Sequence, residues 1–180
     1  MKSNDKQEHN KKKGLSNKAK FTIAGILVMI SILLCLCICL LTLLVLNFRM
    51  FKIEGASMEP NYTNGQSVYA KKINSESNLK RGDVIIQTNK NYAQIGRIVA
   101  IPGDKVEFKD NKVYINGSEE NGDYLPSDSV TLLPSTSVLS NNFVIPSGSY
   151  LILGDNRMNS FDSRNKGLEE IDRINWKIIW

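Results

Sequence analysis

The sequence predicts a mainly β domain of curled antiparallel sheets, preceded by one transmembrane helix. Two observations lead to this prediction. The run from Phe21 to Phe48 contains no charged residue, whereas the chain from Lys52 onward consists of short apolar runs broken by Gly, Asn, Asp and Pro. Because no stretch after the apolar run shows a long helical period, sheets that curl or pack on each other are expected to supply the core.

Residues 1–20 form a basic tail. Its seven lysines outweigh Asp5 and Glu8 and give a formal charge of +5, which equals the net charge of the whole chain. The chain after the apolar run therefore has no net charge, which argues against nucleic-acid binding. Since lysine-rich flanks stay in the cytoplasm, we expect a cytoplasmic N-terminus, an extracytoplasmic C-terminal domain and a tail that contacts lipid head groups.

Residues 21–48 are predicted to be a single-pass signal anchor in the cell membrane. As a helix this run would extend about 42 Å, enough to cross a bilayer with tilt. A buried core helix is one alternative, but such helices are seldom apolar on every face over this length. A cleaved signal peptide is another, but its apolar region would be shorter and a small-residue cleavage site would follow. Here the run continues into Arg49-Met50-Phe51-Lys52.

Cysteine and histidine are absent from residues 49–180. Cys35, Cys37 and Cys39 lie in the predicted span, and His9 lies in the basic tail. The outer domain therefore has no disulfide, no thiolate ligand and no imidazole, so a zinc site is not expected. No cofactor is expected either.

The strands of the domain 49–180 are predicted from apolar runs between turn residues. Asp110-Asn111 and Asn116-Gly117 are turn signals, and the runs on either side of Asp110-Asn111 are typical of a hairpin. Residues 118–141 are polar and rich in serine, and are expected to be the least ordered part. The expected strands are Gln66–Lys71, Val84–Thr88, Gln94–Ile101, Lys105–Lys109, Lys112–Ile115, Asn142–Ile145 and Tyr150–Leu153.

One serine stands in a turn shortly after the predicted span, in the run Gly55-Ala56-Ser57-Met58-Glu59-Pro60. Serine is a poor nucleophile until a positioned base removes its proton. Because the only histidine is His9, a Ser-His-Asp triad outside the membrane is excluded by composition. Any base for Ser57 would have to be a lysine or a carboxylate.

Three further segments are dense in motif residues: Arg81-Gly82-Asp83-Val84-Ile85, the run from Gly96 to Asp104, and the run from Gly154 to Arg164. Together with the Ser57 turn, they resemble the type I signal peptidase family of serine proteases. The resemblance covers nearly the whole chain from the anchor on. It implies a signal-peptidase-like β domain outside the membrane and a hydrolase that processes the signal peptides of secreted proteins after small residues.

The resemblance also implies roles for individual residues. Ser57 matches the family's nucleophile, and Gly96 stands where the family has the lysine that acts as general base. Ser160 matches the hydroxyl that orients this lysine. The supporting positions are Met58, Arg97, Asp162 and Arg164, and the last two are expected to pair on one face of a strand.

Two functions remain open. Because Gly96 supplies no proton acceptor, the first is a signal-peptidase-like protein with impaired catalysis, which binds secreted or pilin precursors by strand addition. Non-catalytic members of this kind occur beside pilus and sortase genes in Gram-positive bacteria, so pilus assembly and a sortase partner are implied. The second is an active signal peptidase that uses Ser57 with a non-standard base, such as Lys90 or Lys105. The motif density argues against a purely structural membrane protein.

Overall fold

The chain divides after Leu44 into two units, and the computed structural model describes residues 16–73, 79–88, 93–120 and 122–179. Helix α1, Asn17–Asn47, makes up the described part of the first unit and ends in the second. The Ser16 hydroxyl caps it by accepting a hydrogen bond from the Ala19 amide at 3.3 Å. No residue of α1 is buried within the protein, and its length and composition suit a membrane span. The helix begins before Phe21, and Phe48 already belongs to the first strand.

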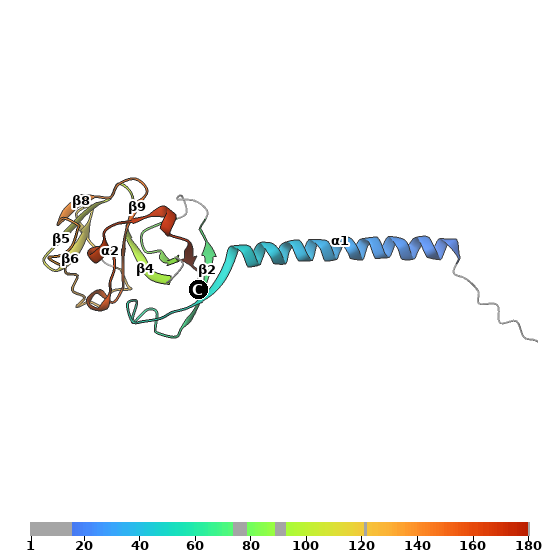
Figure 1. Cartoon of the computed structure of the whole chain (residues 1–180), viewed down its shortest axis with the longest axis horizontal. Helices are drawn as coiled ribbons and strands as arrows, with labels where there is room; N and C mark the ends of the chain where they lie inside the picture. Colours follow the sequence, from blue (N-terminus) through green and yellow to red (C-terminus); the bar gives the residue numbers. More distant parts are fainter. Residues whose placement is uncertain (1–15, 74–78, 89–92, 121, 180) are drawn as a thin grey trace, which may run out of the picture. The chain divides into compact units, whose positions relative to one another are not determined.

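The second unit consists of two antiparallel sheets, which confirms the predicted fold class (Figure 1). The larger sheet has the order β1-β2-β11-β3-β4-β9-β10 and the smaller the order β7-β6-β5-β8. Three short helices lie between the later strands: η2 Arg157–Asn159, α2 Ser163–Lys166 and η3 Ile171–Arg173. The strands are β1 Phe48–Lys52, β2 Ser67–Lys72, β3 Val84–Thr88, β4 Ala93–Ala100, β5 Lys105–Lys109, β6 Lys112–Ile115, β7 Ser118–Glu119, β8 Asn142–Val144, β9 Ser149–Leu153, β10 Glu169–Glu170 and β11 Trp176–Ile178.

Every strand expected from the sequence is present, and its ends agree to within one residue. The sequence patterns missed β1, β7, β10 and β11. β1 follows the apolar run without a break, and the other three strands are too short to show an alternating pattern.

The larger sheet curls on itself. Residues of its edge strand β1 and of β4 line the same hollow, although β2, β11 and β3 lie between them in the sheet. In strand β2, side chains alternate between the inside and the outside of the curl. Val68 and Ala70 are buried, while Tyr69 between them is exposed. The core enclosed by the curl consists of Ile53, Met58, Val68, Ala70, Val84, Ile86 and Ile178.

Strands β4 and β9 connect the two sheets. Val99 and Leu151 on these strands pack with Val106 and Val113 of the smaller sheet. On the other side, Ile98 of β4 and Ile152 of β9 pack with Ile85 of β3. The central strands are therefore covered on both faces, which explains their nearly continuous apolar sequences.

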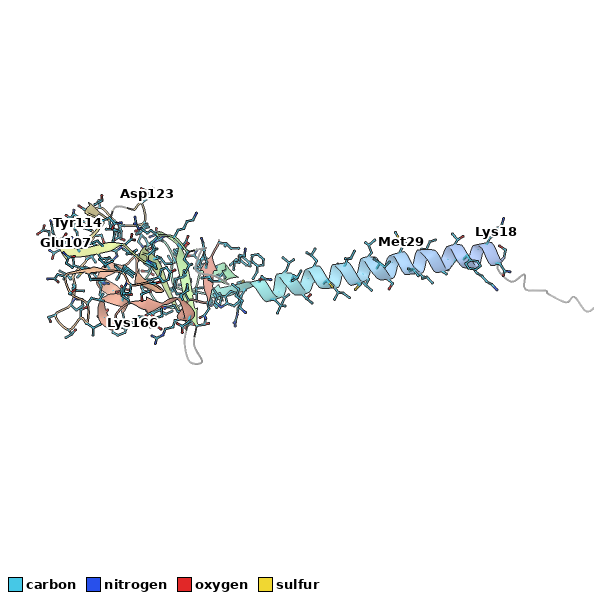
Figure 2. All side chains as sticks on the ribbon, turned by 90° about the horizontal axis from the view of Figure 1, so that it is seen from above. Lys18, Met29, Glu107, Tyr114, Asp123 and Lys166 are labelled. Atoms are coloured by element: carbon cyan, nitrogen blue, oxygen red, sulfur yellow. The ribbon has the colours of Figure 1, made fainter. Side chains whose placement is uncertain are left out.

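The smaller sheet contains the predicted hairpin. Glu107 of β5 is paired with Tyr114 of β6, and the two lie side by side in Figure 2. Asp110 and Asn111 form the turn with φ angles of 52° and 60°. Two successive residues with positive φ are typical of a type I′ turn, whose twist matches that of the flanking strands.

Asp104 fixes the turn between β4 and β5. Its carboxylate accepts hydrogen bonds from the Arg81 guanidinium, from the Ile101 amide at 2.9 Å and from the Asn116 side chain at 3.0 Å. Burial alone would raise the pKa of Asp104. The hydrogen bonds from Arg81, Ile101 and Asn116 outweigh burial, so the pKa lies below its ordinary value of 3.8.

We expect Asp104 to make the domain sensitive to acid. A carboxyl group whose pKa is lowered in the folded state adds stability above its unfolded pKa, and that stability is lost as the pH falls below about 4. Asp104→Asn should therefore lower the free energy of unfolding by about 1 kcal/mol at pH 7, with a smaller difference from the wild type at pH 3. Urea titrations of the full chain in detergent at both pH values measure this, and an equal difference at the two would contradict it.

Candidate active site

The Ser57 turn is held by the segment that follows β9. The Asn156 amide donates to the Ser57 carbonyl at 3.0 Å, and the Asn156 side chain donates to the Ala56 carbonyl at 3.0 Å. The Asp155 amide contacts the Met58 sulfur at 3.4 Å, and Met58 is buried in the core of the larger sheet. Backbone contacts and a buried methionine therefore fix Ser57, whose own side chain is half-buried.

Gly154 brings Ser57 and Ser160 together. A Cβ atom at position 154 would lie 2.1 Å from the Ser160 hydroxyl oxygen and 2.6 Å from the Ser57 carbonyl oxygen. Only glycine fits so close an approach. The structure thus places the two serines that the sequence singled out close to one residue, Gly154.

Gly96 is buried in β4, opposite Ile85 of β3. A Cβ atom at Gly96 would lie 2.5 Å from Cγ2 of Ile152. Ile152 therefore fills the space that a side chain at position 96 would enter. Sequence reasoning missed Ile152, because it lies on β9 and meets Gly96 only through the pairing of β4 with β9.

Gln94 lies on the face of β4 that a side chain at position 96 would share. Residues two apart on a strand share a face, so a side chain at position 96 would lie beside Gln94. The Gln94 side chain donates to the Phe161 carbonyl at 2.6 Å, which ties the loop that contains Ser160 to this face. A long side chain at position 96 would therefore extend toward the Ser160 loop.

A hollow of about 370 Å³ opens beside Ser57. Along β4, β9 pairs only from Arg97 onward, while β3 pairs with residues 93–97. In the described part of the sheet, residues 93–96 thus have one edge without a neighbouring strand. The hollow is lined by Phe51, Lys52, Ile53, Glu54, Ser57, Ile86, Ala93, Gln94 and Ile95.

The lysines proposed as replacement bases lie elsewhere. Lys90 is outside the described residues, and Lys105 is exposed on β5 of the smaller sheet and does not line the hollow. Lys166 donates to the Gln94 side chain at 2.6 Å and pairs with Glu169 at 2.5 Å, and it does not line the hollow. Lys52 does line the hollow, as does Glu54, and the sequence reasoning did not consider either one.

Asp162 and Arg164 form a buried ion pair. Two charge-assisted hydrogen bonds of 2.9 and 2.8 Å join the side chains, and Asp162 also accepts from the Gly154 amide at 3.0 Å. The expectation that the two lie on a strand is wrong. Asp162 is the N-cap of helix α2 and accepts from the Arg164 amide at 3.1 Å, because a carboxylate satisfies the free N–H groups of a helix start.

Comparisons with known proteins identify the family. The family described as signal peptidase, peptidase S26, matches residues 26–178. The chain belongs to this signal peptidase family. It is 37% identical over 143 residues to signal peptidase IB of Staphylococcus aureus, an alignment that covers 71% of this chain and 74% of that protein. It is 35% identical over 132 residues to signal peptidase I of Bacillus licheniformis, with 70% of each chain covered.

Among solved structures, a signal peptidase I from Enterococcus faecalis V583 is 29% identical to the chain. That alignment covers 56% of this chain and 96% of the other, with a TM-score of 0.43. Within the described residues of this signal peptidase family member, no group of three or more His, Cys, Asp or Glu side chains is arranged to hold a metal ion.

In this signal peptidase family chain, Arg97 anchors the polar segment 118–141 to the site. Its guanidinium makes two hydrogen bonds to Asp155, at 2.8 and 2.5 Å, and lies 4.0 Å from the centre of the Tyr124 ring. Asn61, which follows the Ser57 turn, donates to the Tyr124 carbonyl and to Asp155. The expectation of little order in this segment overlooked Tyr124, an aromatic residue that packs well against a guanidinium.

Tyr124 extends this network into a buried chain of polar contacts. Its hydroxyl donates to Glu120 at 2.8 Å, and Glu120 pairs with Arg157 at 2.5 Å. Burial, and then the negative charge of Glu120, raise the pKa of Tyr124 well above its ordinary value, so the ring stays neutral. The segment 154–157, which holds Ser57, is therefore fixed from both sides.

Proposed function

We propose that this chain binds the processing region of translocated precursor proteins outside the membrane and is impaired in cleaving them. The observation that carries the proposal is the site at Gly96. Glycine offers no atom that could take the Ser57 proton, and Ile152 fills the adjoining space. In a Ser/Lys mechanism the serine hydroxyl passes its proton to the base as its oxygen attacks the peptide carbonyl, so a missing base removes most of the catalysis.

The free edge of β4 beside Ser57 supports binding by strand addition. An extended precursor segment can pair with residues 93–96, while its side chains enter the hollow of about 370 Å³. Small and apolar side chains suit the walls formed by Phe51, Ile53 and Ile95. Binding of this kind needs no covalent chemistry, and in this proposal the processing region lies beside Ser57.

The charge distribution along the chain supports a location of precursor binding outside the membrane. We place the basic tail in the cytoplasm and the β domain outside, because lysines flank the N-terminal end of α1. The clients in this proposal are secreted proteins and pilin precursors, with sortase machinery as a partner in surface assembly. These clients rest on the resemblance of the chain to non-catalytic members of the family.

A second candidate function is an active signal peptidase with Ser57 as nucleophile and another base. Lys52 and Glu54 favour it, because both line the same hollow as Ser57. A carboxylate or a neutral amine at this position is the kind of group that acts as a general base. Binding of the precursor is common to both functions, and only cleavage separates them.

The test is cleavage and binding of a preprotein with an Ala-X-Ala site by the full chain in detergent, beside a Ser57→Ala variant. We expect both proteins to bind the preprotein with similar affinity and neither to cleave it above background. Cleavage that disappears in Ser57→Ala would establish the second candidate, and Lys52→Met and Glu54→Gln would then identify its base. Absence of binding would overturn both candidates.

A further inference from the structure

A second hollow, of about 530 Å³, lies next to the Ser57 turn. Glu59 and Pro60, which follow Ser57-Met58 in the chain, form part of its wall. Asn156 also lines it, and the Asn156 amide holds the Ser57 carbonyl at 3.0 Å. The Ser57 turn thus contributes Ser57 to the first hollow and Glu59 and Pro60 to the second, and we infer that a peptide bound in the first continues past Ser57 into the second.

The walls of the second hollow combine apolar surface with free negative charge. Pro60, Pro126, Val130 and Met158 supply the apolar part, and the Met158 side chain is 70% exposed and free to adapt its shape. An apolar wall that ends in charged groups suits a side chain with a long aliphatic stem and a polar head.

Four charged side chains line this hollow, and two of them are already neutralised. Asp155 pairs with Arg97, and Arg157 pairs with Glu120. Glu59 and Asp128 form no ion pair with any residue in the described ranges. They leave the hollow with two uncompensated carboxylates, which select for a cation.

Chain connectivity assigns the two hollows to the two parts of a precursor. Phe51 lines the first hollow and follows the end of α1 at Asn47 within about 14 Å of extended chain. The membrane-proximal part of the precursor, its signal peptide, therefore fits the first hollow. The segment beyond the processing junction then continues past Ser57 into the second.

We propose that the second hollow binds a lysine or arginine side chain from the first few residues after the processing junction. The apolar walls hold the aliphatic stem, and Glu59 and Asp128 meet the cationic head. This inference rests on the proposed binding function and adds a specificity to it. The chain would then distinguish precursors by the charge of their mature N-terminal segment, through Glu59 of the Ser57 run and Asp128 of the segment 118–141.

The test compares peptides that carry an Ala-X-Ala junction followed by lysine, alanine or glutamate at each of the next three positions. Binding to the full chain in detergent is measured by fluorescence anisotropy. We expect the best lysine peptide to bind about 2- to 10-fold more tightly than its glutamate counterpart, as two half-exposed ion pairs allow. The preference should shrink as salt rises from about 0.02 M to about 0.5 M, because screening weakens exposed pairs.

The decisive variant is Glu59→Gln/Asp128→Asn, which should lose the preference for lysine but still bind the alanine peptide. Glu107→Gln/Asp110→Asn removes the same charge from the hairpin of the smaller sheet and should keep the preference. A preference that survives in the first variant, or that is absent from the wild type while the peptides bind, overturns this inference alone. If no peptide binds at all, the proposed function fails and this inference fails with it.

Discussion

Gly96→Lys combined with Ile152→Ala is expected to create Ser57-dependent cleavage of a preprotein. The second substitution is needed because a Cβ atom at position 96 would lie 2.5 Å from Cγ2 of Ile152. Truncation to alanine removes that atom and opens a path along β4. Since a positioned general base contributes about 10²- to 10⁴-fold, cleavage should rise by a factor in this range over the wild type.

The surroundings of Gly96 favour an amine that can act as a base. Position 96 is buried, and burial lowers the pKa of a lysine because it penalises the charged form. The Ser160 hydroxyl and the Ser57 carbonyl lie close together beside Gly154, so a lysine side chain that extends along β4 toward the Ser160 loop is directed toward the Ser57 turn. Gly96 does not have a positive φ angle, so a larger residue there meets no backbone strain.

Two matched variants separate base chemistry from packing. Gly96→Met/Ile152→Ala has a side chain of similar length without the amine and should stay inactive. Gly96→Lys with Ile152 retained should show a smaller rise in cleavage, because the Ile152 side chain must move before the lysine fits. Circular dichroism and precursor binding report folding. A folded Gly96→Lys/Ile152→Ala protein that binds the preprotein but does not cleave it would show that more than the base is missing.

The sequence contains enough local information to predict most of this fold. Apolar runs between turn residues located the central strands, and Asp110-Asn111 located the hairpin turn. The pairing of strands that are far apart in the chain could not be predicted from these local patterns. β11 consists of Trp176–Ile178 and is identifiable only because β2 and β3 leave a place between them. Its formation depends on long-range pairing, which leaves no periodic pattern in three residues.

The candidate site divides in the same way. The run from Gly154 to Arg164 identified Ser160, Asp162 and Arg164 through its resemblance to the family. The side chain of Ile152 beside Gly96 and the carboxylate of Asp128 in the second hollow were not predictable. Ile152 and Asp128 are separated from Gly96 and Ser57 by tens of residues, and only the pairing of β4 with β9 and the course of the segment 118–141 bring them near.

Asp162→Asn is expected to destabilise the β domain by about 3–5 kcal/mol. Arg164 is only 3% exposed, so loss of the partner carboxylate leaves a buried guanidinium without a counter-charge. The Gly154 amide also loses a charged acceptor, which weakens the support of the Ser57 carbonyl and the Ser160 hydroxyl. Urea unfolding of the full chain in detergent, followed by tryptophan fluorescence, measures the change in the free energy of unfolding.

Two controls decide whether the buried charge is the cause. Asp162→Asn/Arg164→Met removes both charges and should recover about 1–2 kcal/mol relative to the single variant, although the Arg157 carbonyl loses its hydrogen bond from Arg164. Glu119→Gln breaks the exposed ion pair with Lys112. It should not shift the midpoint of urea unfolding, because water solvates both side chains. Equal stability of the single and double Asp162 variants would instead assign the loss to the hydrogen bonds of Asp162 with the Gly154 and Arg164 amides. The Ser57 turn would then depend on a helix cap, and the ion pair would serve only to orient that cap.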